Sequence, residues 1–254
     1  MDTKFYINTE ANDDDAYRLA MQFACELAKK DSNIKRIVLY IHTKQNTGWF
    51  DRLFGNETVK RLFNGIKFND CPVPFKFETK LTYKGAMYGN TSDIVICCGI
   101  DADDILIIDD YHSVKYIIAI PWLRKLTEKW IKTWNAIEIS GKEHENIKKN
   151  PEPSEIVKIA MQELTSVINM STGITHHMDN DRAKTYIRTL HKYEPELNSD
   201  LVSSYLIREL NWDTRHAKDI EKLIDTLNNG RYFQGGEKTG LQNHYKRWKA
   251  KSIV

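Results

Sequence analysis

The sequence predicts an α/β protein in which a three-layer domain with a mostly parallel sheet is followed by a small helical domain. Three observations support this fold class. Apolar, β-branched runs alternate with amphipathic helical patterns through residues 1–141, and strands joined by crossover helices pair in parallel. Residues 142–153 are polar and charged, which is typical of a linker. Residues 154–254 then carry mainly helical patterns.

The strands of the first domain are predicted from apolar runs of the kind expected when both faces of a sheet are covered. The run that begins at Phe75 is placed at the edge of the sheet, because Pro72 and Pro74 before it cannot sit inside a ladder. The predicted strands are an opening run from Lys4, residues 34–42, the edge strand from Phe75, and residues 93–100, 114–122 and 136–140.

The helices of the first domain are predicted from apolar side chains at helical spacing. The first helix follows the acidic turn 13–15 and ends near Ala28. A second helical pattern covers residues 49–64 and is interrupted by Gly55, and a third covers residues 123–135. Residues 105–111 form a short segment between two strands. This alternation predicts a Rossmann-like order of elements.

The second domain is predicted to hold four helices. The first begins at Pro153 and Ser154, a common helix start, and the others cover residues 182–192, 199–210 and 214–228. Asn229 and Gly230 close the last of these, and residues 231–240 are predicted to turn back as a short hairpin.

The composition limits the classes of partner. The 254 residues are 41% hydrophobic and carry 37 Lys and Arg against 35 Asp and Glu, a net charge of +2. This balance gives no long-range field toward nucleic acid or a membrane surface. No apolar run approaches the roughly 18 residues that span a bilayer, and the opening lacks a signal-peptide pattern. We therefore expect a cytoplasmic protein with no membrane partner.

The four cysteines show no C-x-x-C spacing, which disfavours a zinc or redox motif. They are predicted to be reduced core thiols. Cys97 and Cys98 are adjacent in a strand, so their side chains should face opposite sides of the sheet.

Residues 7–16, INTEANDDDA, resemble the amino-terminal signature of the nucleoside hydrolases. In that family this loop binds Ca²⁺, and a carboxylate activates the water that attacks the ribose. The resemblance implies that Glu10 and Asp15 are metal ligands or the base, and that Asp14 lies near the ribose. The chemistry suits such a cluster, because Ca²⁺ prefers several carboxylate oxygens and acidifies a bound water.

The sequence departs from that signature at three points. Asn8 replaces an aspartate, Glu10 replaces another, and the usual glycine of the intervening gap is missing. An acidic run is also an ordinary helix start, because negative charge in the first turn complements the helix dipole. A metal site and a helix start therefore remain alternatives.

A second polar cluster covers residues 169–181, NMSTGITHHMDND. Ser171, Thr172 and Gly173 could offer hydroxyl and amide groups to a phosphate. Four further side chains could act as a base or as metal ligands, and in an enzyme His176 or His177 would be the acid; the four are His176, His177, Asp179 and Asp181. The alternative is an interdomain turn in which Asp179 or Asp181 caps the next helix.

The second domain resembles a winged-helix module, because three helices precede a glycine-rich hairpin. Helix 214–228 would then occupy the DNA-reading position. Its basic residues are offset by acidic ones, which disfavours nucleic acid as a partner and favours an accessory or dimerising domain. Only the tail is basic.

The whole chain also resembles uncharacterised bacterial proteins that pair a Rossmann-like domain with a winged-helix-like end. The resemblance rests on residues 171–176, Asn211 and Trp212.

Two functions are therefore weighed. The favoured one is binding of a small polar, nucleotide- or nucleoside-like ligand where parallel strands end. The ligand-binding residues would be Asp13, Thr43, Lys44, Gly99, Asp101, Ser171, Thr172 and Gly173. The alternative is a metal-dependent N-ribohydrolase with Glu10, Asp14, His176 and His177 as catalytic residues and Ca²⁺ as the candidate cofactor. A DNA-binding regulator is a further alternative, and no G-x-G-x-x-G or P-loop pattern occurs.

Overall fold

The computed structural model describes residues 3–10, 13–84, 92–141, 152–194 and 196–253. The chain divides into two compact units, Met1–Ile147 and Lys148–Val254, and each is described by itself. Most of the predicted linker, residues 142–153, lies outside the described residues.

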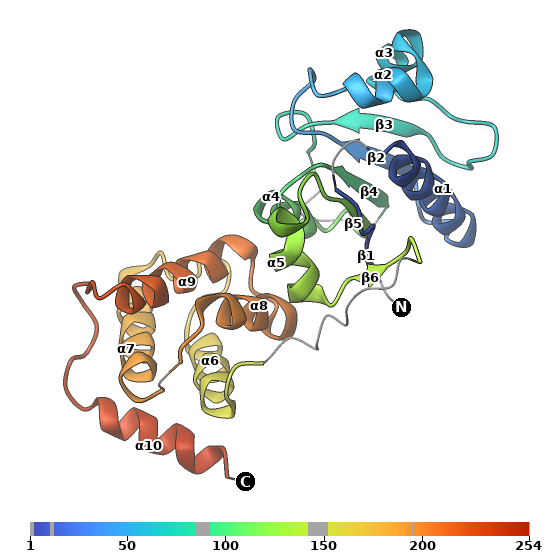
Figure 1. Ribbon diagram of the computed structural model, residues 1–254. Helices are drawn as coiled ribbons and strands as arrows, with labels where there is room; N and C mark the ends of the chain where they lie inside the picture. The colour runs from blue at the N-terminus through green and yellow to red at the C-terminus, as the bar shows by residue number, and fades with distance from the viewer. Residues whose placement is uncertain (1–2, 11–12, 85–91, 142–151, 195, 254) are drawn as a thin grey trace. The chain divides into compact units, whose positions relative to one another are not determined.

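The first unit is built on a six-stranded sheet in which every pairing is parallel, as the sequence predicts (Figure 1). The strand order is β3-β2-β4-β5-β1-β6. The strands are β1 (Lys4–Tyr6), β2 (Arg36–Tyr40), β3 (Phe75–Glu78), β4 (Asp93–Cys98), β5 (Val114–Ile120) and β6 (Ile137–Glu138). The strand from Phe75 is at the edge, where its preceding prolines cost no ladder hydrogen bond.

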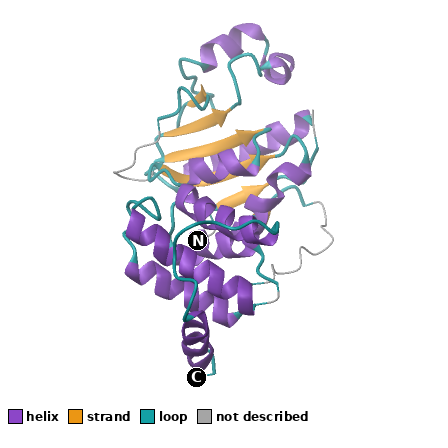
Figure 2. Cartoon of the chain, turned by 90° about the vertical axis from the view of Figure 1, so that its left-hand side faces the viewer, coloured by secondary structure: helices purple, strands orange, loops and turns teal. Residues whose placement is uncertain are grey.

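Helices cover both faces of this sheet, which gives the predicted three layers (Figure 2). One face shares a buried core with α1 (Asp14–Lys30), α2 (Gly48–Phe54) and α3 (Asn56–Leu62). On the other side α4 (Ala102–Asp109) packs on β5 and on α5 (Arg124–Trp134). Because both faces are covered, all six residues of β4 are buried.

Two details of the first unit differ from the sequence prediction. The helix predicted over residues 49–64 is two short helices, because Gly55 ends α2 and begins α3 with a backbone conformation outside the helical region. The short segment predicted over residues 105–111 is the helix α4, which begins earlier because Asp101 caps it.

Among the residues that the structure describes, the regular elements of the second unit are all helices. They are α6 (Glu155–Val167), α7 (His177–Tyr193), α8 (Ser199–Leu210), α9 (Thr214–Asn228) and α10 (Leu241–Lys251). The bounds of α8 and α9 match the prediction. α7 packs against α6, α9 and α10, and its buried side chains include Ile187 and Leu190.

Two predictions for the second unit are wrong, and one helix was not predicted. α7 begins at His177 rather than at Arg182, because Asp179 lies inside its first turn and pairs with Arg182 instead of capping the helix. Residues 231–240 form no hairpin and contain no strand. α10 was not predicted, although Leu241 and Trp248 recur at helical spacing and are both buried.

None of the described helices is long and apolar enough to cross a bilayer.

Candidate functional site

The topology places switch points at the carboxyl ends of the strands. After β2 the chain enters α2 and α3 on one face of the sheet, whereas after the neighbouring β4 it enters α4 on the other. The same reversal occurs between β5, followed by α5, and its neighbour β1, followed by α1. In open α/β sheets, ligands bind at such points. We call the residues that follow β1, β2, β4 and β5, at the carboxyl ends of these strands, the sheet edge. The term does not refer to the outermost strands of the sheet, β3 and β6.

Aromatic rings meet at the sheet edge. Trp122 follows β5 and Trp49 lies in the first turn of α2, and their ring centroids are 5.9 Å apart. The ring of Tyr17 from α1 stacks on Trp49 at 5.8 Å. Gly99 at the end of β4 lies directly under Trp122, because a Cβ at Gly99 would be 3.6 Å from the Trp122 Cβ. Trp122 is nevertheless 38% exposed, so an apolar ring faces solvent at a switch point.

The acidic turn after β1 is a helix start. Asp13 caps α1, and its Oδ1 accepts hydrogen bonds from the amides of Asp15 and Ala16, each at 3.1 Å. Its other oxygen accepts the Thr9 hydroxyl at 2.8 Å. Asp14 pairs with Arg52 of α2 at 3.0 Å, which joins the ends of β1 and β2. Both carboxylates therefore already have structural partners.

Glu10 and Asp15 are exposed, and Asp15 pairs with Arg18 at 2.8 Å on the surface of α1. The described residues contain no group of three or more His, Cys, Asp or Glu side chains that could hold a metal ion. The structure therefore does not gather Glu10, Asp14 and Asp15 around one point, and Ca²⁺ binding stays a prediction.

The remaining predicted ligand-binding residues of the first unit lie after β2 and β4. The Thr43 amide donates to Asn46 at 3.1 Å, and the Lys44 ammonium lies 6.0 Å from the centre of the Phe63 ring. Asp101 caps α4 by accepting the Asp104 amide at 3.0 Å. Since β2 and β4 are neighbours, the fold brings these residues to the same edge.

A half-buried glutamate that carries no sequence motif, Glu138, fixes the end of β1. The Glu138 carboxylate accepts the backbone amides of Asn8, Ser140 and Gly141 at 3.1, 2.8 and 3.0 Å. Burial raises the pKa of Glu138, but these hydrogen bonds outweigh it, so the net shift is downward and the group stays ionised at neutral pH. Two of its partners, Ser140 and Gly141, follow closely in the chain, but the contact that ties it to β1 comes from the Asn8 amide, 130 residues away, and leaves no local pattern.

The three long helices that leave the sheet edge start differently. α1 and α4 begin under aspartate caps, whose carboxylates occupy amide groups and repel an anion. The N-cap residue of α5 is Leu123, whose side chain cannot accept a hydrogen bond, and the first turn of the helix carries the exposed residues Arg124 and Lys125. Among these three starts, only that of α5 combines uncapped amides with positive charge, which is the arrangement that favours a phosphate.

In the second unit the predicted phosphate-binding residues form a turn. The amide and hydroxyl of Ser171 both donate to the side chain of Asn169, and the Thr172 hydroxyl and Gly173 amide donate to its backbone carbonyl. Gly173 presses on the buried His216 of α9, because a Cβ there would be 2.3 Å from the His216 Nδ1. These donors are engaged within the unit, and their binding to a ligand stays a prediction.

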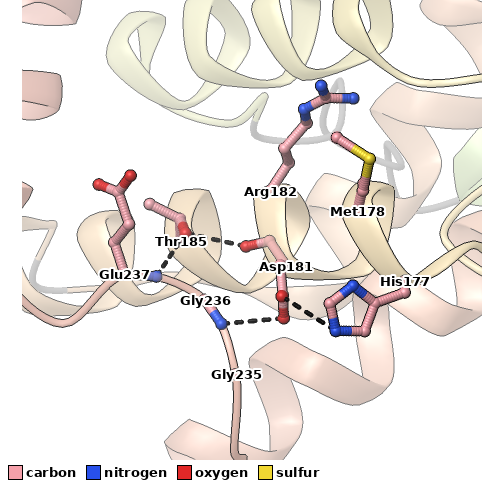
Figure 3. Close-up of a pocket in the computed structure, with 8 residues that line it drawn as sticks. All are labelled: His177, Met178, Asp181, Arg182, Thr185, Gly235, Gly236 and Glu237. Carbon is pink, nitrogen blue, oxygen red and sulfur yellow. Dashed lines mark hydrogen bonds and ion pairs between the residues drawn. The ribbon is translucent and has the colours of Figure 1, made fainter.

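The two predicted histidines begin α7. His176 is its first flanking residue and makes no side-chain cap hydrogen bond. His177 lines an open cavity of about 500 Å³, with its Nε2 3.5 Å from Asp181 Oδ2 (Figure 3). The Asp181 carboxylate also accepts the Gly236 amide at 3.0 Å, from the side opposite His177. The pair is too long for a hydrogen bond, and a catalytic role for either histidine stays a prediction.

Residues 231–240, which we call the strap, are held by side chains of α7. Thr185 accepts the Glu237 amide at 2.8 Å, and Arg188 donates to the carbonyls of Phe233, Gly235 and Glu237 at 3.2, 3.0 and 2.7 Å. These bonds replace the strand pairing that a hairpin would have provided.

One family model matches the chain. Residues 153–249 are similar to a domain of unknown function, DUF1889, a range that covers α6 through most of α10. Searches of curated proteins and of solved structures found no match.

Proposed function

We propose that the first unit binds a small nucleoside- or nucleotide-like ligand at the sheet edge. The observation that carries the proposal is the exposed Trp122 ring over the end of β4, between two topological switch points. The second unit is then an accessory or dimerising domain.

The planar part of the ligand stacks on Trp122. A base–aromatic stack contributes about 1–3 kcal/mol. The Trp49 ring packs beside the Trp122 ring, with the two centroids 5.9 Å apart, and the Tyr17 ring stacks on Trp49 at 5.8 Å. Polar groups of Thr43 and Lys44, which follow β2, lie at the same edge and supply hydrogen bonds.

A phosphate binds at the start of α5. Its uncapped amides and the charges of Arg124 and Lys125 favour an anion, whereas the aspartate caps of α1 and α4 oppose one. This start follows β5 and adjoins Trp122 in the chain, so one nucleotide could reach both.

Isothermal titration of the full chain with adenosine and with ATP tests the proposal. We expect saturable binding, tighter for ATP, that Trp122→Leu weakens about tenfold or more. Tyr232→Leu is the matched control, because Tyr232 is an 80% exposed aromatic residue of the other unit. Absence of binding across a panel of purine and pyrimidine nucleosides and nucleotides would contradict the proposal.

A charge reversal separates the phosphate from the base. Lys125→Glu should weaken ATP about tenfold and leave adenosine nearly unchanged, because only the phosphate meets the start of α5. Lys30→Glu makes the same change of net charge at the far end of α1 and should have little effect. Equal losses in the two variants would show a non-specific effect of net charge.

The metal-dependent ribohydrolase is the alternative at the same edge, and no described group of ligands favours it. Titration of Ca²⁺ into the metal-free chain tests it: micromolar binding that Asp15→Ala abolishes would support a metal site.

The DNA-binding alternative depends on a basic face of the second unit. In α10 two basic side chains, Arg247 and Lys251, are already paired with Glu163.

A further inference from the structure

Three sulfur atoms line one cavity of the first unit. Met21 and Cys25 are four residues apart, on the same face of α1, and Cys71 faces them from the segment between α3 and β3. The cavity has a volume of about 220 Å³.

The two thiols are in contact. The Cys25 and Cys71 side chains form a hydrogen bond. A cation that binds both sulfur atoms therefore needs little movement of either segment. Cys71 is only 2% exposed, whereas Cys25 is half-buried.

The surroundings are apolar. Phe54, Phe68 and Phe75 line the same cavity and shield the sulfur atoms from water, while the charged groups of Arg18 and Asp70 complete its lining. The cavity holds no histidine, and Asp70 is its single carboxylate. Thiolate and thioether groups in a shielded site select soft cations over Ca²⁺, Mg²⁺ or Mn²⁺.

We propose that Met21, Cys25 and Cys71 form a binding site for a soft monovalent cation of the copper(I) type. Two S–H bonds break, two sulfur–metal bonds form and two protons pass to solvent, so the cation and the two thiolates together carry one negative charge. The Met21 thioether is a third, neutral ligand. No oxidation or reduction takes place.

Competition between the reduced full chain and bicinchoninate for copper(I), without oxygen, tests the proposal. We expect one bound copper(I) per chain. Cys25→Ala and Cys71→Ala should each weaken binding at least about 100-fold, and Met21→Leu about tenfold. Cys97→Ala is the matched control, because Cys97 is a fully buried thiol of β4 that does not line the cavity.

A second measurement uses the unaltered chain, so that a misfolded variant cannot decide the result. Copper(I) should protect Cys25, the more exposed of the two thiols, from alkylation, mapped by mass spectrometry, and should not change the labelling of Cys97 and Cys98. Unchanged labelling of Cys25, or equal loss of binding in Cys97→Ala, would overturn the proposal.

Discussion

The sheet edge and the strap both gather polar groups, but they use them differently. At the sheet edge, carboxylates cap helices or form exposed pairs, as Asp13 and Asp15 do. In the strap, α7 side chains hold the backbone of a segment with no regular structure, through Thr185 and Arg188. The sheet edge therefore keeps its shape through the sheet, whereas the strap depends on a few close contacts. Single substitutions should cost far more in the strap.

The largest effect is expected at Gly236. Its φ is +68°, and a Cβ there would be 2.9 Å from the Lys184 Cβ and 3.0 Å from the backbone amide of Thr185. Gly236→Ala should lower the free energy of unfolding by about 3 kcal/mol, because it combines a left-handed backbone with overpacking. Urea unfolding of the full chain measures this.

Gly230→Ala separates the two causes. Gly230 has nearly the same φ, +69°, but nothing lies within 4 Å of a Cβ there. It should cost only about 1 kcal/mol, the cost of the backbone conformation alone. Equal costs at both positions would mean that the strap does not pack closely on α7.

A smaller effect is expected from acid, at the contact that ties α10 to α6. Burial raises the pKa of Glu163, but three donors outweigh that effect and lower it to about 2. The donors are Tyr186, Lys251 and Arg247. Because the folded pKa is below the unfolded value of about 4.3, this stabilisation is present above pH 4.3 and is lost as the pH falls toward 2.

The loss should be about 2 kcal/mol and should appear as faster hydrogen exchange in α6 and α10 between pH 5 and pH 2, after correction for intrinsic rates. Glu163→Gln should remove this pH dependence. Glu155→Gln, on the same helix with a 61% exposed side chain, is the control and should retain it. A Glu163→Gln variant with the full pH dependence would exclude this carboxylate as its source.

The smallest effects belong to the acidic turn. Asp13→Ala removes the cap of α1 and should cost about 1 kcal/mol, whereas Asp15→Ala removes only an exposed pair and should cost less than about 0.5 kcal/mol. Thermal unfolding of the two variants in buffer containing a calcium chelator compares them. A larger cost for Asp15→Ala would show that this side chain has a structural role beyond its contact with Arg18.

The sheet could be predicted because its signal is local. Each strand is a continuous apolar run, and the prolines before Phe75 mark the edge strand. The strap could not be predicted from its glycines, because the groups that satisfy its backbone, such as Arg188, lie some 45 residues away in the chain and leave no local pattern. α10 had a local signal in Leu241 and Trp248, which the basic composition of the tail concealed.

The sequence predicted where the candidate site lies in the fold, but not which residues make it up. Parallel strands place Thr43, Lys44, Gly99 and Asp101 at one edge, as expected. A helix cap and a metal ligand look alike in sequence, so the acids after β1 could not be assigned from it; the structure shows that Asp13 caps α1. Trp122 carries no motif, because its exposure depends on the packing of α5 and α2.

The most direct test of ligand binding at the sheet edge is the indole N–H region of a ¹⁵N NMR spectrum of the full chain, recorded with and without ATP. The six tryptophans give one signal each, with Trp212 and Trp248 in the second unit as internal references. Binding at the sheet edge predicts that the signals of Trp122 and Trp49 move on saturation while those of Trp212 and Trp248 stay fixed. Shifts confined to Trp212 and Trp248, or no shift at saturating ATP, would contradict it.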